Sequence, residues 1–156
     1  MSAEKPAPQE LRVSAIRNGT VIDHIQNEVT FKVAEILRLE AEEHMVTVGM
    51  NLHSDRMGKK GIIKIESREL TPQEVSKIAL IAPQATLNII KDYRVVEKGR
   101  VELPDRLEGI VRCFNPNCVT NQQQVPTCFE VRSTSPVALR CVYCERVMSG
   151  PDIILK

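Results

Sequence analysis

The chain has 156 residues, a formal net charge of +1, 3% aromatic residues and no tryptophan. Such a chain lacks the basic face with which nucleic-acid-binding proteins displace counterions, and it has few rings to stack on bases. No apolar run approaches the length of a membrane span, and the polar N-terminal segment has no signal-peptide core. Composition therefore argues against nucleic acid and membranes as partners, and we expect a cytoplasmic protein.

The first quarter of the chain predicts two strands and a helix. Residues 1–10 are polar and contain prolines, so we expect a disordered tail there. Extended segments are expected over 11–16 and 20–25, separated by the turn signal Asn18-Gly19. Asn27 is expected to cap a helix whose apolar face repeats with helical spacing. That face comprises Val29, Val33, Ile36 and Leu37.

Two further strands are expected before the middle of the chain. The segment 44–53 alternates with period two, which predicts one apolar face made of Val46, Val48, Met50 and Leu52. A polar loop is expected over 54–60. A strand follows over 61–67, with Ile63 and Ile65 on one side and Lys64 on the other.

A second helix has a complete set of start signals. Thr71 is expected to cap it, Pro72 fits its first position, and Glu74 closes a capping box. The buried side of this helix is expected to comprise Val75, Ile78, Ala79 and Ala82. Pro83 ends the helix, and extended segments follow over 85–90 and 93–98.

The order of these elements predicts an α+β fold, a ferredoxin-like sandwich with helices on one face of an antiparallel sheet. The polar segment 99–108 contains Pro104 and is the expected linker. Beyond it, strands are expected near Ile110, over 129–132 and 138–141, and near Val147. The predicted domains are therefore 11–103 and a small all-β, zinc-ribbon-like domain over 104–156.

Four cysteines in the last third of the chain form two close pairs. Cys113 and Cys118 flank F-N-P-N, and Cys141 and Cys144 flank V-Y. Two such pairs suit one tetrahedral Zn²⁺ bound by four thiolates, with no position left open for chemistry. Two disulfides, or cysteines that only pack, are the alternatives. A fifth cysteine, Cys128, lies outside both pairs, and a reducing compartment disfavours disulfides.

Groups for catalysis are poorly represented. The sequence M-G-K-K-G lacks the spacing of a phosphate-binding loop, and the three histidines are scattered along the chain. The pair C-V-Y-C could form a redox site only if it stayed free of metal. We therefore predict that the chain is not an enzyme.

Polar residues interrupt the apolar strands of the first domain. They are Asp23, His24, Lys64, Asn88, Tyr93, Arg94 and Lys98. Cations, a carboxylate and an amide are the groups that bind phosphates, a ribose and a base. The alternative is that each faces solvent on a half-buried strand.

Four segments together resemble the regulatory chain family of aspartate carbamoyltransferase. They are NGTVIDHI at 18–25, IIKIE at 62–66, APQATLN at 82–88, and the four-cysteine pattern with its flanks. The resemblance implies a non-catalytic subunit that binds CTP and ATP, with UTP as a further effector, and thereby modulates pyrimidine biosynthesis. It also implies a zinc domain that contacts the catalytic chain, and regulatory dimers that bridge catalytic trimers.

The resemblance also implies a role for each site residue. The base would lie against the backbone near Ile16 and Tyr93, in a slot lined by Val13, Ala15 and Ile90. Asp23 and Lys64 would address the ribose. The phosphates would meet His24, Arg94 and Lys98, with Asn88 supporting the pocket, and the zinc ligands would be Cys113, Cys118, Cys141 and Cys144. The rival hypothesis is a zinc-ribbon nucleic-acid-binding factor, which explains the cysteines alone.

Overall fold

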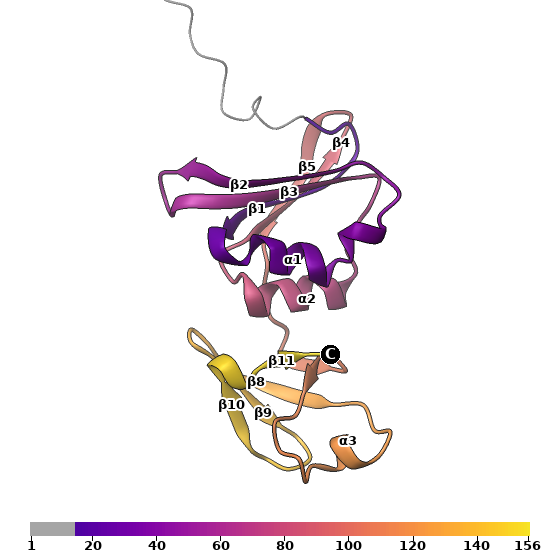
Figure 1. Ribbon diagram of the computed structural model, residues 1–156, viewed down its shortest axis with the longest axis vertical. Coiled ribbons are helices and arrows are strands. Elements are labelled where there is room, and N and C mark those ends of the chain that lie inside the picture. The colour runs from indigo at the N-terminus through magenta and orange to yellow at the C-terminus, as the bar shows by residue number, and fades with distance from the viewer. Residues whose placement is uncertain (1–14) are drawn as a thin grey trace, which may run out of the picture. The chain divides into compact units, whose positions relative to one another are not determined.

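The computed structural model describes residues 15–156, which divide into two compact units (Figure 1). Unit 1 comprises the described residues up to Leu70 together with Gln84–Val101. Unit 2 comprises Thr71–Pro83 and Glu102–Lys156. The predicted strand over 11–16 lies mostly outside the described residues, and Val13 lies outside them as well.

Unit 1 is built on a five-stranded sheet in the order β2-β3-β1-β4-β5, with every neighbouring pair antiparallel. The strands are β1 (Gly19–Gln26), β2 (Val46–Ser54), β3 (Gly58–Glu66), β4 (Thr86–Lys91) and β5 (Arg94–Arg100). The central order β2-β3-β1-β4 is that of a ferredoxin-like sheet, with β5 added at the edge. The predicted α+β class is confirmed.

Helix α1 (Thr30–Ile36) lies along one face of this sheet (Figure 1). A 3₁₀ turn (Asn27–Val29) precedes it and another (Leu39–Ala41) follows it. Strand β3 approaches α1 so closely at Gly61 that a Cβ there would collide with the buried Thr30 side chain. Residues Ile63 and Ile65, at the same parity of β3 as Gly61, therefore face the helix side and are fully buried.

The predicted cap of the first helix is wrong. Asn27 begins the 3₁₀ turn, and the residue before α1 is Val29, which makes no side-chain cap bond. The Asn27 amide instead pairs with Asn51 of β2: its Oδ1 accepts from the Asn51 N–H at 2.7 Å, and its Nδ2 donates to Asn51 Oδ1 at 2.8 Å. A long-range partner has displaced the local one.

The predicted single apolar face of the second strand is also wrong. Val46 and Val48 pair with Ile65 and Ile63 and so share the helix side of the sheet. The register shifts between Gly49 and Leu52, where Asn51 has φ +59°. Because one extra residue reverses the alternation, Leu52 packs on the other face, against the cluster of Ile16, Val21, Ile62 and Ile90.

Unit 2 contains helix α2 (Pro72–Ile81), which begins with the predicted capping box. Thr71 Oγ1 accepts from the Glu74 N–H at 3.2 Å, and Glu74 Oε1 accepts from the Thr71 N–H at 3.0 Å. Leu80 packs against the core of unit 2, and Lys77 Nζ donates to the Lys156 carbonyl at 3.4 Å. These contacts group the helix with the cysteine-bearing part of the chain.

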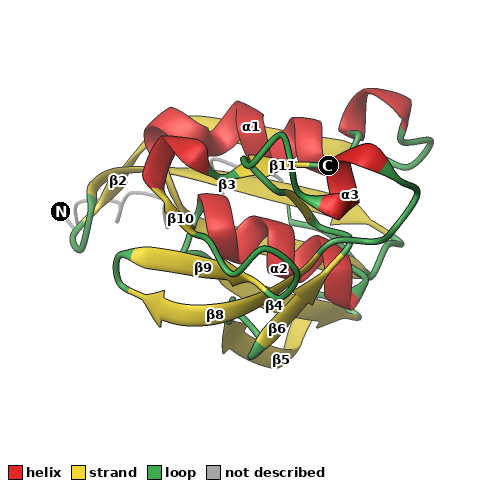
Figure 2. Ribbon diagram, turned by 90° about the horizontal axis from the view of Figure 1, so that it is seen from below, coloured by secondary structure: helices red, strands yellow, loops and turns green. Residues whose placement is uncertain are grey.

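The rest of unit 2 is mostly β (Figure 2). One sheet has the order β10-β9-β8-β6, and the pair β11-β7 forms another. The strands are β6 (Arg106–Glu108), β7 (Val111–Arg112), β8 (Cys128–Thr134), β9 (Val137–Cys141), β10 (Val147–Ser149) and β11 (Ile154–Leu155), with a short helix α3 (Val119–Gln122) and a 3₁₀ turn (Gly150–Asp152). Leu107, Phe129, Leu139 and Met148 fill its core.

The predicted linker is shorter than expected. Of the segment 99–108, the first two residues belong to β5 and the last three form β6, which leaves 101–105 between the strands. Leu107 is fully buried and anchors β6 against Phe129 of β8. Polar flanking residues concealed this strand in the sequence, because only one of its three side chains faces the core.

Candidate metal centre and effector face

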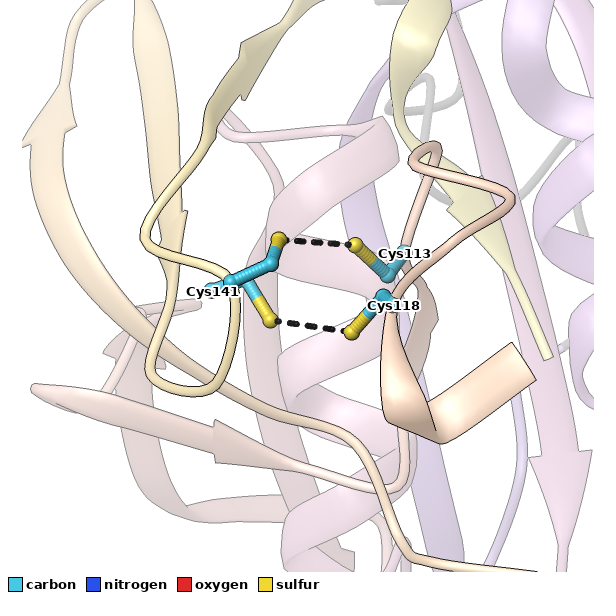
Figure 3. A group of neighbouring side chains, drawn as sticks. Cys113, Cys118 and Cys141 are labelled. Atoms are coloured by element: carbon cyan, nitrogen blue, oxygen red, sulfur yellow. Dashed lines mark hydrogen bonds between the residues drawn. The ribbon is translucent and has the colours of Figure 1, made fainter. Parts of the chain in front are cut away.

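The four paired cysteines meet at one point of unit 2. Their Sγ atoms all lie within 4.8 Å of one another, with 3.7 Å between Cys113 and Cys144 and 3.7 Å between Cys118 and Cys141. Figure 3 shows Cys113 and Cys118 pointing from the first loop toward the loop of Cys141. Three of the four are buried and Cys144 is partly buried.

These separations fit a shared metal and not disulfides. Sulfurs bonded at about 2.3 Å to one tetrahedral metal lie about 3.8 Å apart. The two distances of 3.7 Å are close to this value. A disulfide needs about 2.05 Å, and all five cysteines of the described chain are free. The four residues therefore form a candidate site for a structural metal, as the spacing predicted, and Cys128 takes no part in it.

The protonation of the cluster follows from its burial. Burial raises the pKa of Cys113 to about 12 and raises the pKa of Cys141 as well. Burial acts in the same direction on Cys144, but hydrogen bonds from the Arg146 backbone, the Asn115 side chain and the thiols of Cys113 and Cys141 together outweigh it and lower that pKa to about 7. Burial therefore disfavours negative charge on the sulfurs of Cys113 and Cys141 unless a cation shares the site.

In unit 1, the sheet face opposite α1 carries several of the predicted ligand groups. Residues paired directly across antiparallel strands project from the same face. Lys64 pairs with Val21, Val21 with Asn88, and Asn88 with Lys98. We call Lys64, Asn88 and Lys98 the polar row; Val21 lies between the first two of them. Lys64 is only 8% exposed, whereas Lys98 is exposed.

Asp23 and His24 lie at one end of β1, next to further cations. The Asp23 carboxylate forms an ion pair with Lys60 Nζ at 2.9 Å, and it also accepts from the His24 backbone N–H. His24 has φ +56°, and its Nδ1 lies 3.0 Å from Thr86 Oγ1. Burial lowers the pKa of His24; the Asp23 carboxylate opposes this shift, and Lys60, Arg56 and Lys98 add to it. The ring is therefore largely neutral near pH 7.

The residues predicted to line a base slot are partly brought together. Ile16 and Ile90 belong to one apolar cluster. Ala15, which precedes Ile16 in the sequence, is exposed. Tyr93 is 67% exposed in the tight turn between β4 and β5, and its N–H donates to the Arg17 carbonyl at 2.9 Å. The backbones near Ile16 and Tyr93 are thus neighbours.

Arg94 is not brought to the other predicted residues. The register between β4 and β5 shifts after Ile89, so Arg94 pairs with Lys91, while Val95 pairs with Ile90. The Arg94 side chain therefore projects from the sheet face opposite that of Ile90 and Lys98. A one-residue irregularity in an exposed edge strand leaves no mark in the sequence.

Two cations near His24 were missed by the sequence analysis. Lys60 and Arg56 fall in the segment 54–60 that was expected to be a polar loop, but strand β3 starts at Gly58 and includes Lys60. The extended alternation G-K-K-G-I-I-K could have indicated that Lys60 and Lys64 lie on one strand.

Among the described residues, no helix is long and apolar enough to cross a membrane.

The fold and the cysteine cluster together define a two-part chain with a candidate site for a structural metal, in which four thiol ligands would leave no position for a substrate. The chain belongs to the aspartate carbamoyltransferase regulatory chain family: the model of that family's allosteric domain matches residues 11–102, and the model of its metal binding domain matches residues 105–154.

Curated proteins with the name aspartate carbamoyltransferase regulatory chain are similar over nearly the whole chain. The protein of Methanothermobacter thermautotrophicus is 53% identical over 147 residues, which cover 94% of both chains. That of Pyrococcus abyssi is 53% identical over 147 residues, covering 93% of this chain and 97% of the relative. That of Parabacteroides distasonis is 48% identical over 156 residues and covers both chains completely.

Family membership confirms the prediction of a regulatory, non-catalytic chain with an allosteric and a metal-binding domain. A regulatory chain of aspartate carbamoyltransferase implies a catalytic chain as its partner. The rival hypothesis of a nucleic-acid-binding factor is accordingly set aside.

Proposed function

We propose that unit 1 binds CTP and ATP, with UTP as a further effector, on the sheet face opposite α1. The observation that carries this proposal is the polar row, in which Lys64, Asn88 and Lys98 share one face of the sheet, with Val21 of β1 between Lys64 and Asn88. Polar groups of this kind on a partly apolar sheet face suit a ligand with a base, a sugar and phosphates.

Each part of the nucleotide has a proposed contact. The base lies against the backbone near Ile16 and Tyr93, in a slot that Val13, Ala15 and Ile90 line. Asp23 and Lys64 address the ribose, and Asn88 supports the pocket. His24 and Lys98 meet the phosphates, and the nearby charges of Lys60 and Arg56 add to the attraction for an anion. The register of Arg94 argues against a direct role for it.

We propose Zn²⁺ as the metal of unit 2. Four thiolates are soft ligands, and their separations suit tetrahedral coordination. When bound, the metal supplies a cross-link between the two cysteine loops and no reaction. The expected compartment is the cytoplasm, where reducing conditions keep the thiols available. Metal analysis of the purified chain tests this, with one zinc per chain expected.

The metal-bearing region over 104–156 is proposed to hold the catalytic chain, and the nucleotide region over 11–103 to pair with a second regulatory chain. Paired regulatory chains would then bridge two catalytic trimers. Met45 is exposed immediately before the edge strand β2, and Val48 within that strand is exposed too, which supports an apolar contact with a second copy. A nucleotide would regulate catalysis if it bound two arrangements of this assembly with different affinity.

Two measurements test the proposed function. Calorimetry of the metal-loaded chain with CTP and with ATP should show binding of each. Co-purification should show that the chain brings down a catalytic carbamoyltransferase subunit. A chain that bound neither nucleotide would refute the effector site, and a chain that failed to capture the catalytic subunit would refute the assembly role.

A further inference from the structure

The loop that carries the first cysteine pair is closed by a side chain that is not a metal ligand. Asn121 Nδ2 donates hydrogen bonds to the carbonyls of Cys113 and Asn115, each at 2.8 Å. The Cys118 N–H donates to the same Asn115 carbonyl at 3.0 Å. Asn115 is buried, and its own Oδ1 accepts from the Asn117 N–H at 3.1 Å. The turn between the two cysteines is thus fixed by hydrogen bonds from within the chain.

A second side chain of the same short helix contacts a sulfur directly. Thr120 Oγ1 donates to Cys118 Sγ at 3.2 Å. Helix α3 starts immediately after Cys118, whose carbonyl accepts from the Asn121 N–H at 2.9 Å. This single helical turn folds the Thr120 hydroxyl back over the sulfur and aims the Asn121 amide at the preceding loop.

We propose that Thr120 and Asn121 are positioning residues of the metal centre: Thr120 tunes the Cys118 sulfur through its hydroxyl, and Asn121 holds the first cysteine loop in its ligating shape. The proposal rests on the metal site proposed above and extends it to residues outside the ligand set.

The physical reason lies in the charge of the site. Four thiolates around a divalent cation leave a net charge of about −2 in a mostly buried place. A hydroxyl that donates to one sulfur withdraws part of that charge, and a hydrogen bond to a charged acceptor is stronger than a neutral one. The Asn121 amide acts differently, because it touches carbonyls and no sulfur: it lowers the entropy that the loop must lose when the ligands converge.

The matched variants are Thr120→Val and Thr120→Ser, with Thr127→Val as the control. Valine keeps the shape of Thr120 and removes the donor, whereas serine keeps the donor. Thr127 is 2% exposed, and its Oγ1 has no hydrogen-bond partner among residues 15–156, so its replacement removes a buried hydroxyl that serves no ligand. Zn²⁺ affinity of the full-length chain would be measured by competition with a chromogenic chelator.

We expect Thr120→Val to bind Zn²⁺ about 10–100-fold more weakly, the usual effect of losing an outer partner of a metal ligand. Thr120→Ser should recover most of that loss, and Thr127→Val should match the wild type. In the Co²⁺-loaded protein, the sulfur-to-metal charge-transfer band of Thr120→Val should move to lower energy, because the sulfur electrons are no longer stabilised. Asn121→Ala should weaken binding without moving the band.

The outcomes distinguish a failure of the positioning roles from a failure of the proposed metal site. If the wild type binds neither Zn²⁺ nor Co²⁺, the metal site itself fails and this proposal fails with it. Wild-type affinity in Asn121→Ala would overturn the role of Asn121. If the wild type binds both metals and Thr120→Val matches it in affinity and spectrum, the role of Thr120 is overturned. It is also overturned if Thr120→Ser is as weak as Thr120→Val, since the loss would then reflect packing and not the hydroxyl.

Discussion

Replacing the two lysines of the polar row tests the nucleotide site, and the structure sets a different magnitude for each. A charge-assisted hydrogen bond contributes about 1.5–3 kcal/mol. Lys64 is 8% exposed, so little solvent screens its charge, and Lys64→Met should lie near the upper value, about a hundredfold in Kd. Lys98 is exposed, so Lys98→Gln should lie near the lower value, about tenfold.

The assay is calorimetry with CTP and with ATP on the metal-loaded chain, with Lys91→Gln as the control. Lys91 follows Ile90 on β4 and so projects from the opposite face of the same sheet. The Lys91→Gln variant should therefore bind nucleotide as the wild type does. Unchanged affinity in both Lys64→Met and Lys98→Gln, or an equal loss in Lys91→Gln, would refute the placement of the ligand on this face.

Three further outcomes are expected. Cys141→Ser should lose the metal and unfold unit 2 by near-ultraviolet circular dichroism, whereas Cys128→Ser should keep the metal; retention of metal by Cys141→Ser would count against the four-thiolate site. Gly61→Ala should lower the free energy of unfolding by about 1–3 kcal/mol in urea titrations, because its Cβ would collide with buried Thr30, and an unchanged midpoint would contradict this close packing. Nucleotide affinity should rise from about pH 8 to about pH 6 more in the wild type than in His24→Gln, because a bound polyanion favours protonation of a ring whose pKa burial holds low; equal pH profiles would remove His24 from the phosphate contacts.

The features that the sequence predicted well are those encoded within a few residues. The capping box at Thr71 and Glu74 needs only a spacing of three, and it forms as expected. Each cysteine pair lies within one short loop, so the spacing alone predicted that its two sulfurs point to one metal. That the two loops meet at the same point is a property of the folded chain. The order of strands and helices was enough to predict the ferredoxin-like sheet.

The features that the sequence did not predict depend on contacts between distant residues. Asn27 is a residue type that often caps helices, but its side chain forms hydrogen bonds with Asn51 of strand β2 instead. The irregularity at that same Asn51 moves Leu52 to the other face, and a second one moves Arg94 away from Lys98. Alternation in a sequence assumes a regular register, and a bulge is specified by the partner strand as much as by its own residues.

We propose that nucleotides regulate the catalytic chain only through the metal-bearing part of this chain. This claim is tested by carbamoyl transfer to aspartate, measured for the catalytic chain alone, with the metal-loaded regulatory chain, and with its Cys141→Ser variant, each with and without CTP or ATP. We expect the catalytic chain alone to be indifferent to nucleotide, the wild-type mixture to respond, and the Cys141→Ser mixture not to respond although calorimetry shows that the variant still binds nucleotide. A full nucleotide response in the Cys141→Ser mixture would contradict the claim, because regulation would then pass by a route that does not need the metal centre.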